Sequence, residues 1–367
     1  MKKFRLLLLC ALVGILVALT YYLFETAVHN SINFVWDTAF NSGNNRLLVI
    51  PLCIIIGLIF FGFQHLLAPG SDSKEAHSLG GEPIDPTIRN LSIILLLGYL
   101  SLLSGASLGP EAVLVPAATV IGGLVGVKFL KTNKKAANIL VGAAIMALMT
   151  AFFHSIAIGI LSVLLVTKQA KIKVSTDILI VAVVSSVSSF LVLNMIDPEN
   201  RYLNLPTITW RVAIVDILVA FILVNTGYMT TFFLSISHTS FVMLRKKAQL
   251  TSWWRLASFA TIGLSILYLM GGPLVQFTGN ESIAPLIEQA GGLGMIGLIG
   301  ILIIKIFVIS WSKAMGYRGG LIFPMIFVAS TLVAMAQVIF TDANFGIGLI
   351  AAMAGILLAE KKAKILL

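Results

Sequence analysis

The amino-acid sequence predicts an all-α, polytopic integral membrane protein, and three observations support this fold class. Hydrophobic residues make up 58% of the 367 residues and charged residues only 11%. The mean hydropathy is +1.01, and apolar runs recur from one end of the chain to the other. Glycine and proline interrupt several of these runs. Soluble domains carry roughly 25% charged residues, so a soluble globular fold is excluded.

The apolar runs are predicted to be membrane-spanning helices. About 20 apolar residues suffice to cross a bilayer, and a helix satisfies its own backbone hydrogen bonds in hydrocarbon. The approximate spans that we expect are 6–31, 47–68, 91–108, 112–130, 136–152, 154–167, 174–195, 209–240, 254–271, 291–311, 321–340 and 343–359.

These spans differ in length. The run 209–240 is too long for one upright helix and is predicted to tilt, kink or divide. The runs 136–152 and 154–167 are short and are separated by a break at 152–155. Unequal, broken helices are typical of transporters and channels. Because apolar runs extend from end to end, we expect one transmembrane domain, residues 1–367, without a cytoplasmic regulatory domain.

The net charge of +10 lies mainly on short connections between the predicted helices. This distribution is typical of cytoplasmic loops and would also attract anions toward the mouth of a pore. The basic start, Met1 to Arg5, precedes an apolar run that continues to Leu23 without a small-residue cleavage site. We therefore expect an uncleaved first helix with a cytoplasmic N-terminus. The predicted location is the cell membrane, with the lipid bilayer and not nucleic acid as partner.

No residues form the constellation of an enzyme. The five histidines are scattered, and the two cysteines, Cys10 and Cys53, fall in apolar runs without metal-ligand spacing. The sequence has no glycine-rich loop with the lysine and hydroxyl that hold phosphates. We expect no enzymatic activity, no catalytic residue, no cofactor and no bound metal.

One interruption contains a carboxylate. The stretch Ser104 to Val113, SGASLGPEAV, lies between two apolar runs and holds Glu111 at the start of a predicted helix. A helix N-terminus stabilises an ionised carboxylate and equally a small anion, so the two would compete for one position. Protonation would remove this competition, which is the behaviour of a gate. The alternative is a glutamate that caps a helix in a surface loop.

A second interruption, Gly316 to Pro324, also immediately precedes an apolar run. Two such breaks, one in each half of a chain, are typical of transporters built from inverted repeats. The predicted halves are about 1–195 and 205–360. Trp253 and Trp254 precede another run and are predicted to anchor it at the headgroup level.

Three other ionisable residues lie in or beside the predicted helices. Lys305 could supply a supporting charge for a pore or extend to the membrane surface. Asp216 could pair with Arg211 or with a neighbouring helix. His154, at a break, is either a hydrogen-bonded helix end or a proton relay.

The two interruptions resemble signatures of the CLC family of chloride channels and proton-coupled anion exchangers. Gly109 and Glu111 match that family's Gly-Arg-Glu-Gly-Pro motif, although Pro110 replaces the arginine. Gly320 and Pro324 match its later Gly-x-Phe-x-Pro motif. The order and spacing of these fragments extend the resemblance over residues 6–360, and it implies a CLC-like inverted repeat of tilted and broken helices.

The resemblance also implies functional residues. Glu111 would be the gating glutamate, and Ser71, about forty residues earlier, the inner anion-contacting serine. Gly109 and the amides of Gly320 to Phe323, which include Leu321 and Ile322, would form the anion site. Lys305, fourteen positions before Gly319, falls where the family carries a basic residue. Family members are homodimers with one pore in each subunit.

The sequence departs from the family in two places. Proton-coupled members use an inner glutamate, and the corresponding position here falls near Val166. The family also continues into further helices with an anion-contacting tyrosine, whereas no tyrosine follows Tyr317 here. The first departure favours passive conduction, or exchange by another proton path, over the family's standard coupled mechanism.

We therefore expect an anion channel or transporter that moves chloride or a similar small monovalent anion. One alternative is a proton-coupled exchanger of chloride, fluoride or nitrate. Another is a truncated, non-conducting relative that assembles with a partner, and a cation transporter is the weakest possibility.

Overall fold

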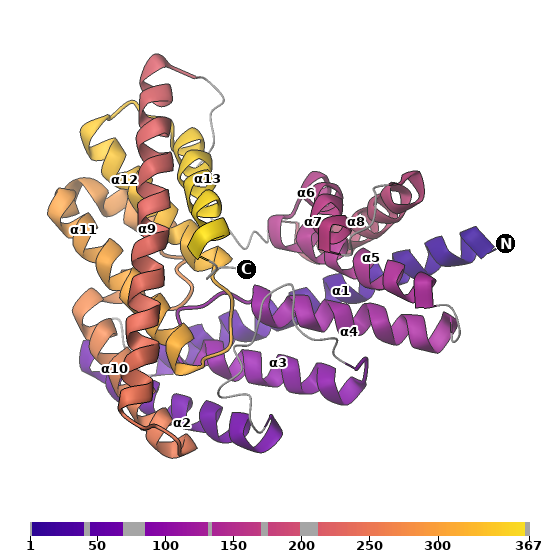
Figure 1. Ribbon diagram of the computed structural model, residues 1–367, viewed down its shortest axis with the longest axis horizontal. Helices are drawn as coiled ribbons and strands as arrows, with labels where there is room; N and C mark the ends of the chain where they lie inside the picture. The colour runs from indigo at the N-terminus through magenta and orange to yellow at the C-terminus, as the bar shows by residue number, and fades with distance from the viewer. Residues whose placement is uncertain are drawn as a thin grey trace. The chain divides into compact units, whose positions relative to one another are not determined.

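The structure is a computed structural model that describes residues 2–39, 45–68, 85–130, 134–169, 175–198 and 212–363. In these residues the regular structure is helical, and the one β-type contact is an isolated bridge between two glycines (Figure 1). Eight of the described helices are long and apolar enough to cross a membrane. The predicted all-α, multi-pass membrane fold is thereby confirmed.

The longer helices follow the predicted spans closely. They are α1 (Lys2–Ile32), α2 (Val49–Leu67), α3 (Ile88–Leu103), α4 (Glu111–Leu130), α5 (Lys134–Phe153), α8 (Thr176–Ile196), α9 (Ile214–Lys247), α10 (Trp253–Gly271), α11 (Ile283–Met315), α12 (Ile322–Ile339) and α13 (Phe345–Ala363). Short elements complete the list: α6 (Ile156–Leu161), α7 (Val163–Gln169), a π-helical turn Asn33–Ala39, and 3₁₀ turns Arg46–Leu48 and Pro273–Val275.

The structure corrects several predicted boundaries. Helix α3 ends at Leu103 and not at 108, because residues 104–110 leave the helical conformation. The span predicted from 291 begins at Ile283, and the glycine-rich stretch inside α11 contains a kink at Gly294, whose φ is 61°. The span 154–167 is two short helices, α6 and α7.

The longest span is one helix. Helix α9 has 34 residues, which corresponds to about 50 Å at 1.5 Å per residue. This length exceeds the roughly 30 Å hydrocarbon core of a bilayer, so α9 must tilt in a membrane or extend beyond it.

The described chain forms two compact units. Unit 1 comprises Met1–Asn30, Ser78–Tyr99 and Ala112–Tyr202, and unit 2 comprises Ser31–His77, Leu100–Glu111 and Leu203–Leu367. In unit 1, hydroxyl side chains tie helices together: Ser189 Oγ of α8 donates to the Ala147 carbonyl of α5 over 2.9 Å. Small residues allow the helices of unit 1 to pack closely, since a Cβ on Gly159 of α6 would overlap Thr150 Oγ1 of α5. Such contacts are common between membrane helices.

Unit 2 contains a close pair of helices, α9 and α13, which lie side by side (Figure 1). A Cβ on Gly227 would overlap the carbonyl oxygen of Ala352, and one on Gly355 would overlap that of Val224. Asp216 joins the N-terminal ends of the two helices. One carboxylate oxygen accepts from the Ala213 amide and the other from the Asn344 amide, each at 2.7 Å.

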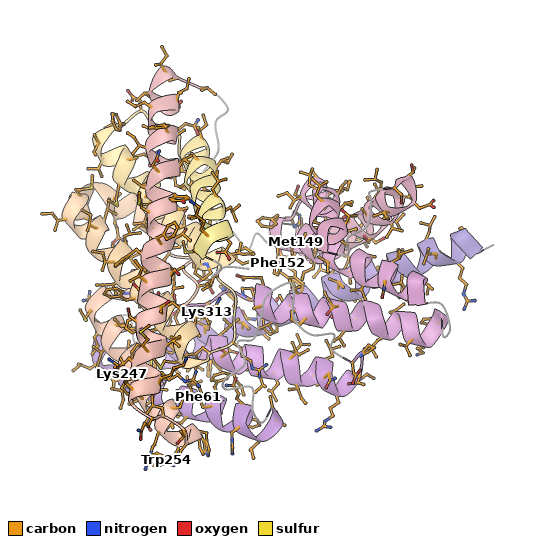
Figure 2. The ribbon with its side chains drawn as sticks, viewed as in Figure 1. Phe61, Met149, Phe152, Lys247, Trp254 and Lys313 are labelled. Carbon is orange, nitrogen blue, oxygen red and sulfur yellow. The ribbon has the colours of Figure 1, made fainter. Side chains whose placement is uncertain are left out.

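One end of unit 2 is basic and aromatic, and we call it the basic end. It comprises Arg245, Lys246 and Lys247 at the end of α9, Trp253, Trp254 and Arg255 at the start of α10, and His65 near the end of α2. Figure 2 shows Lys247 and Trp254 at this end. The rings of His65 and Trp253 stack with centroids 6.0 Å apart. Lysine, arginine and tryptophan gathered in this way are typical of a membrane–water interface.

Candidate anion site

The first interruption is a glycine-dependent turn. Helix α3 ends at Leu103, and Gly105 has a φ of 94°, a left-handed conformation that favours glycine. Tyr268 Oη donates to the Gly105 carbonyl and accepts from the Phe277 amide at 2.8 Å. Pro110 immediately precedes α4, where its missing N–H costs no helical hydrogen bond. The chain therefore leaves α3, turns inside the protein and enters α4 at Glu111.

The second interruption meets the first through the backbone. Gly316 ends α11 with a φ of 92°, and α12 begins after Leu321. Between them, Gly320 N donates to Gly109 O over 2.7 Å, and Gly109 N donates to Gly320 O over 2.8 Å. The two interruptions predicted from the sequence are thus paired with each other.

The Glu111 carboxylate lies at this junction. Its residue is only 6% exposed, and Oε1 accepts from the Ile322 amide at 2.7 Å, although the two residues are 211 positions apart. The Phe323 amide and the Lys313 charge also interact favourably with it. Oε2 is buried and has no hydrogen-bond partner among the described residues. The alternative of a surface helix cap is therefore wrong.

Glycine makes room for this carboxylate. A Cβ on Gly109 would overlap Oε2, and a Cβ on Gly320 would overlap Oε1. The carboxylate is consequently enclosed by two glycine backbones and by the first amides of α12. These are donor groups that would serve a small anion equally well.

A polar segment before α11 braces the first interruption. Ser107 Oγ donates to Phe277 O over 2.7 Å, and Thr278 Oγ1 donates to Leu108 O over 2.8 Å. In addition, the Ser107 amide donates to Ser312 Oγ over 3.2 Å. The position of the turn before Glu111 is thus fixed from two directions.

Lys305 holds the bracing segment. Its side chain is fully buried, and Nζ donates to Phe277 O at 2.8 Å and to Val275 O at 3.1 Å. Nζ also lies 4.9 Å from the centroid of the Phe327 ring. Extension of this side chain to the membrane surface, one of the two alternatives, is therefore wrong. Among the described contacts, Nζ is bonded to carbonyl oxygens and not to Glu111.

The predicted site residues are brought together in part. Gly109, Gly320 and Ile322 contact each other or Glu111 directly, and Leu321 and Phe323 flank Ile322 at the start of α12. Ser71 lies outside the described residues, so its role stays a prediction. Sequence reasoning missed Thr278 and Tyr268 because these residues belong to no motif. The one available signal was the polar break at 276–282 between two apolar runs.

The other residues considered in the sequence analysis have packing or helix-end contacts in the structure. Asp216 caps α9 and bonds to the start of α13. His154 has a φ of 47° at the end of α5, with its ring 5.1 Å from that of Phe190. Val166, near the position that corresponds to the family's inner glutamate, packs against an apolar cluster that includes Val163. Cys10 and Cys53 are buried and free.

Helices long and apolar enough to cross a membrane, and two chain interruptions that meet around a carboxylate bonded to the first amide of a helix, are features of a membrane channel or transporter. A family model described as "Voltage gated chloride channel" matches residues 71–366. The chain belongs to this family, the CLC family, and it is a multi-pass anion channel or transporter.

Solved structures share the fold. A slow cyanobacterial Cl⁻/H⁺ antiporter superposes with a TM-score of 0.74 at 19% identity, covering 97% of this chain and 85% of the other. A CLC-type fluoride/proton antiporter gives 0.69 at 17% identity, covering 98% and 87%. A eukaryotic CLC transporter gives 0.69 at 16% identity, covering 98% and 72%. A search of the curated proteins found no match.

Proposed function

We propose that this protein moves chloride or a similar small monovalent anion across the cell membrane, and that Glu111 gates the path. The observation that supports this proposal is the hydrogen bond from the Ile322 amide to the buried Glu111 carboxylate. The ionised carboxylate occupies the amides that a dehydrated anion would use. Withdrawal of the side chain leaves these amides to the anion, which binds without a full positive side chain and can therefore leave again.

The gate follows the charge of Glu111. The ionised carboxylate is attracted to the amides at the start of α12, whereas the protonated group loses most of this attraction. Low external pH therefore opens the path, and flux should rise as external pH falls. At high pH Glu111 is deprotonated, and its carboxylate then occludes the site.

Removal of the carboxylate tests the proposal. We expect Glu111→Ala to raise chloride efflux from proteoliposomes several-fold at neutral pH and to abolish its dependence on external pH. Asp342→Ala, which removes an exposed acid on the loop before α13, serves as a control and should behave like the wild type. Unchanged flux and unchanged pH dependence in Glu111→Ala would refute the assignment of the gate.

Proton-coupled exchange of chloride, fluoride or nitrate is the second candidate. It is favoured by the structural similarity to proteins described as Cl⁻/H⁺ and fluoride/proton antiporters. The apolar packing of Val166 argues against the family's inner-glutamate route. An imposed chloride gradient that drives protons uphill would support exchange, whereas passive flux alone would support a channel. Absence of any flux from folded protein would favour a non-conducting relative.

The orientation follows from the charges. If α1 and α2 each cross the membrane once, the N-terminus and the end of α2 lie on the same side. The end of α2 belongs to the basic end, which the positive-inside rule places in the cytoplasm. The proposed N-terminus is therefore cytoplasmic.

The assembly and the internal symmetry are also proposals. The homodimer and the inverted halves, about 1–195 and 205–360, follow from the family, and the two paired interruptions fit one broken helix in each half. Ser71 would contact the anion from the cytoplasmic side. Crosslinking in membranes tests the homodimer.

A further inference from the structure

Phe277 has a backbone conformation that is rare for a large side chain. Its φ is 51°, which lies in the left-handed region that glycine, asparagine and aspartate adopt more readily. Such a conformation persists only where the surrounding structure holds it, and it is frequent at functional sites. Phe277 belongs to the bracing segment before α11, and sequence reasoning gave it no role. The contacts that hold it therefore indicate what it does.

The backbone groups of Phe277 are bonded to the first interruption. Its carbonyl accepts from Ser107 Oγ at 2.7 Å, and its amide donates to Tyr268 Oη at 2.8 Å. Tyr268 Oη in turn donates to the Gly105 carbonyl. Gly105 and Ser107 precede Glu111 by six and four residues. One residue outside the first interruption therefore fixes two positions of the turn that leads to the carboxylate.

The Phe277 ring is also connected to this turn, through Trp36. The two rings pack edge to face, with centroids 5.0 Å apart and planes at 84°. The indole nitrogen of Trp36 donates to the Leu103 carbonyl at the end of α3 over 3.0 Å. A Cβ on Gly105 would lie 3.3 Å from the Trp36 ring, and Trp36 is fully buried. The side chain of Phe277, like its backbone, thus supports the chain before Glu111.

Lys305 stabilises the conformation of Phe277. Its buried Nζ donates to the Phe277 carbonyl at 2.8 Å, so this carbonyl accepts from an ammonium group and from Ser107 Oγ together. Hydrogen bonds from a charged donor are stronger than neutral ones. Rotation of the Phe277 backbone to an ordinary φ would move its peptide groups away from Lys305, Ser107 and Tyr268 at once. These bonds therefore offset the strain and fix one arrangement.

We propose that Phe277 is a positioning residue of the Glu111 gate. Its strained peptide holds the turn 104–110 so that α4 begins with the Glu111 carboxylate against the Ile322 amide. Lys305 acts on the gate through this peptide. The inference rests on the proposed function, and it adds a residue that sets how firmly the ionised carboxylate closes the path.

The pH profile of chloride flux tests this role. Phe277→Ala removes the ring contact and disfavours the left-handed φ, so the turn should move and the Ile322 amide should hold the ionised carboxylate less firmly. The external pH of half-maximal flux should then rise by about 0.5–1 unit, which corresponds to the free energy of roughly one hydrogen bond. Phe277→Asn, which tolerates the left-handed conformation, should shift the profile less. Ser107→Ala, which removes one bond to the peptide, should shift it in the same direction.

A matched control separates positioning from backbone strain in general. Gln249, between α9 and α10, also has a left-handed φ, of 48°, and is exposed. Gln249→Ala should leave the profile unchanged, and an equal shift in Gln249→Ala and Phe277→Ala would overturn the proposal. So would an unchanged profile in both Phe277→Ala and Ser107→Ala. In a Glu111→Ala background, Phe277→Ala should change flux little, whereas a purely structural role would lower flux in both backgrounds.

The inference and the proposed function can fail separately. If neither the wild type nor Glu111→Ala carries chloride, the proposed function fails. Crystal structures of the wild type and of Phe277→Ala at one pH then decide the positioning role. A Glu111 carboxylate displaced from the Ile322 amide in the variant would support it, and a carboxylate in its original place would overturn it. Size-exclusion profiles establish that each variant is folded.

Discussion

At the scale of single residues, the glycines around Glu111 determine where its carboxylate can lie. Both Gly109 and Gly320 are in contact with it, and a methyl group at either position would occupy its volume. The absence of a side chain at Gly109 and Gly320 is therefore as important for the proposed closed gate as the presence of Glu111. This arrangement leads to a prediction that does not alter the carboxylate itself.

We predict that Gly320→Ala displaces the Glu111 side chain and opens the path. Because the added methyl group overlaps Oε1, chloride efflux at neutral pH should rise toward that of Glu111→Ala. In the double variant with Glu111→Ala the overlap disappears, so Gly320→Ala should then have little further effect. Gly300, whose added Cβ would meet nothing within 4 Å, provides the Gly300→Ala control. Additive effects of the two substitutions would contradict the mechanism, because independent sites are additive.

At the scale of helices, one carboxylate connects the N-terminal ends of α9 and α13. Asp216 accepts hydrogen bonds from the amides of Ala213 and Asn344 and is only 3% exposed. Asp216→Ala removes the acceptor of both amides, and because Ala213 is exposed and Asn344 half-buried, we expect a cost of about 1 kcal/mol for each lost hydrogen bond. We predict a lower midpoint of thermal unfolding in detergent and unchanged flux per folded molecule. Asp342→Ala should leave the midpoint unchanged. A fall in flux per folded molecule in Asp216→Ala would contradict the prediction and give Asp216 a functional role.

Most helices were predictable from the sequence, because apolar runs in a bilayer have few alternatives to helix. Glu111 and the 316–324 segment were also identified, since glycine, proline and a carboxylate are unusual inside apolar runs. The pairing of Gly109 with Gly320 could not be predicted from the sequence, because hydrogen bonds between backbone groups form with almost any residue and leave no sequence pattern. Likewise, a lysine in an apolar run is compatible with burial beside a pore and with extension to the membrane surface. Only the contacts of Lys305 with Phe277 and Phe327 distinguish these two environments.

At the scale of the whole molecule, the proposed orientation makes a prediction that labelling can check. Both native cysteines, Cys10 and Cys53, are fully buried, so background reaction with a membrane-impermeant thiol reagent should be low. Lys247→Cys at the basic end should react only from the cytoplasmic side. Glu281→Cys, in an exposed position between α10 and α11, should react only from outside, because α10 separates the two positions. Reaction of both from the same side would contradict the topology.

The backbone pairing of Gly109 and Gly320 also bears on how far such a protein can diverge in sequence. Gly109 and Gly320 pair through backbone N–H and C=O groups alone, so this pairing does not depend on the identity of the side chains beside them. Replacement of the family's arginine by Pro110, or of its phenylalanine by Ile322, therefore leaves the main-chain hydrogen bonds available. Many side chains of such a motif can therefore change in evolution while the paired backbone and its carboxylate are kept, provided that the two glycines and the glutamate remain.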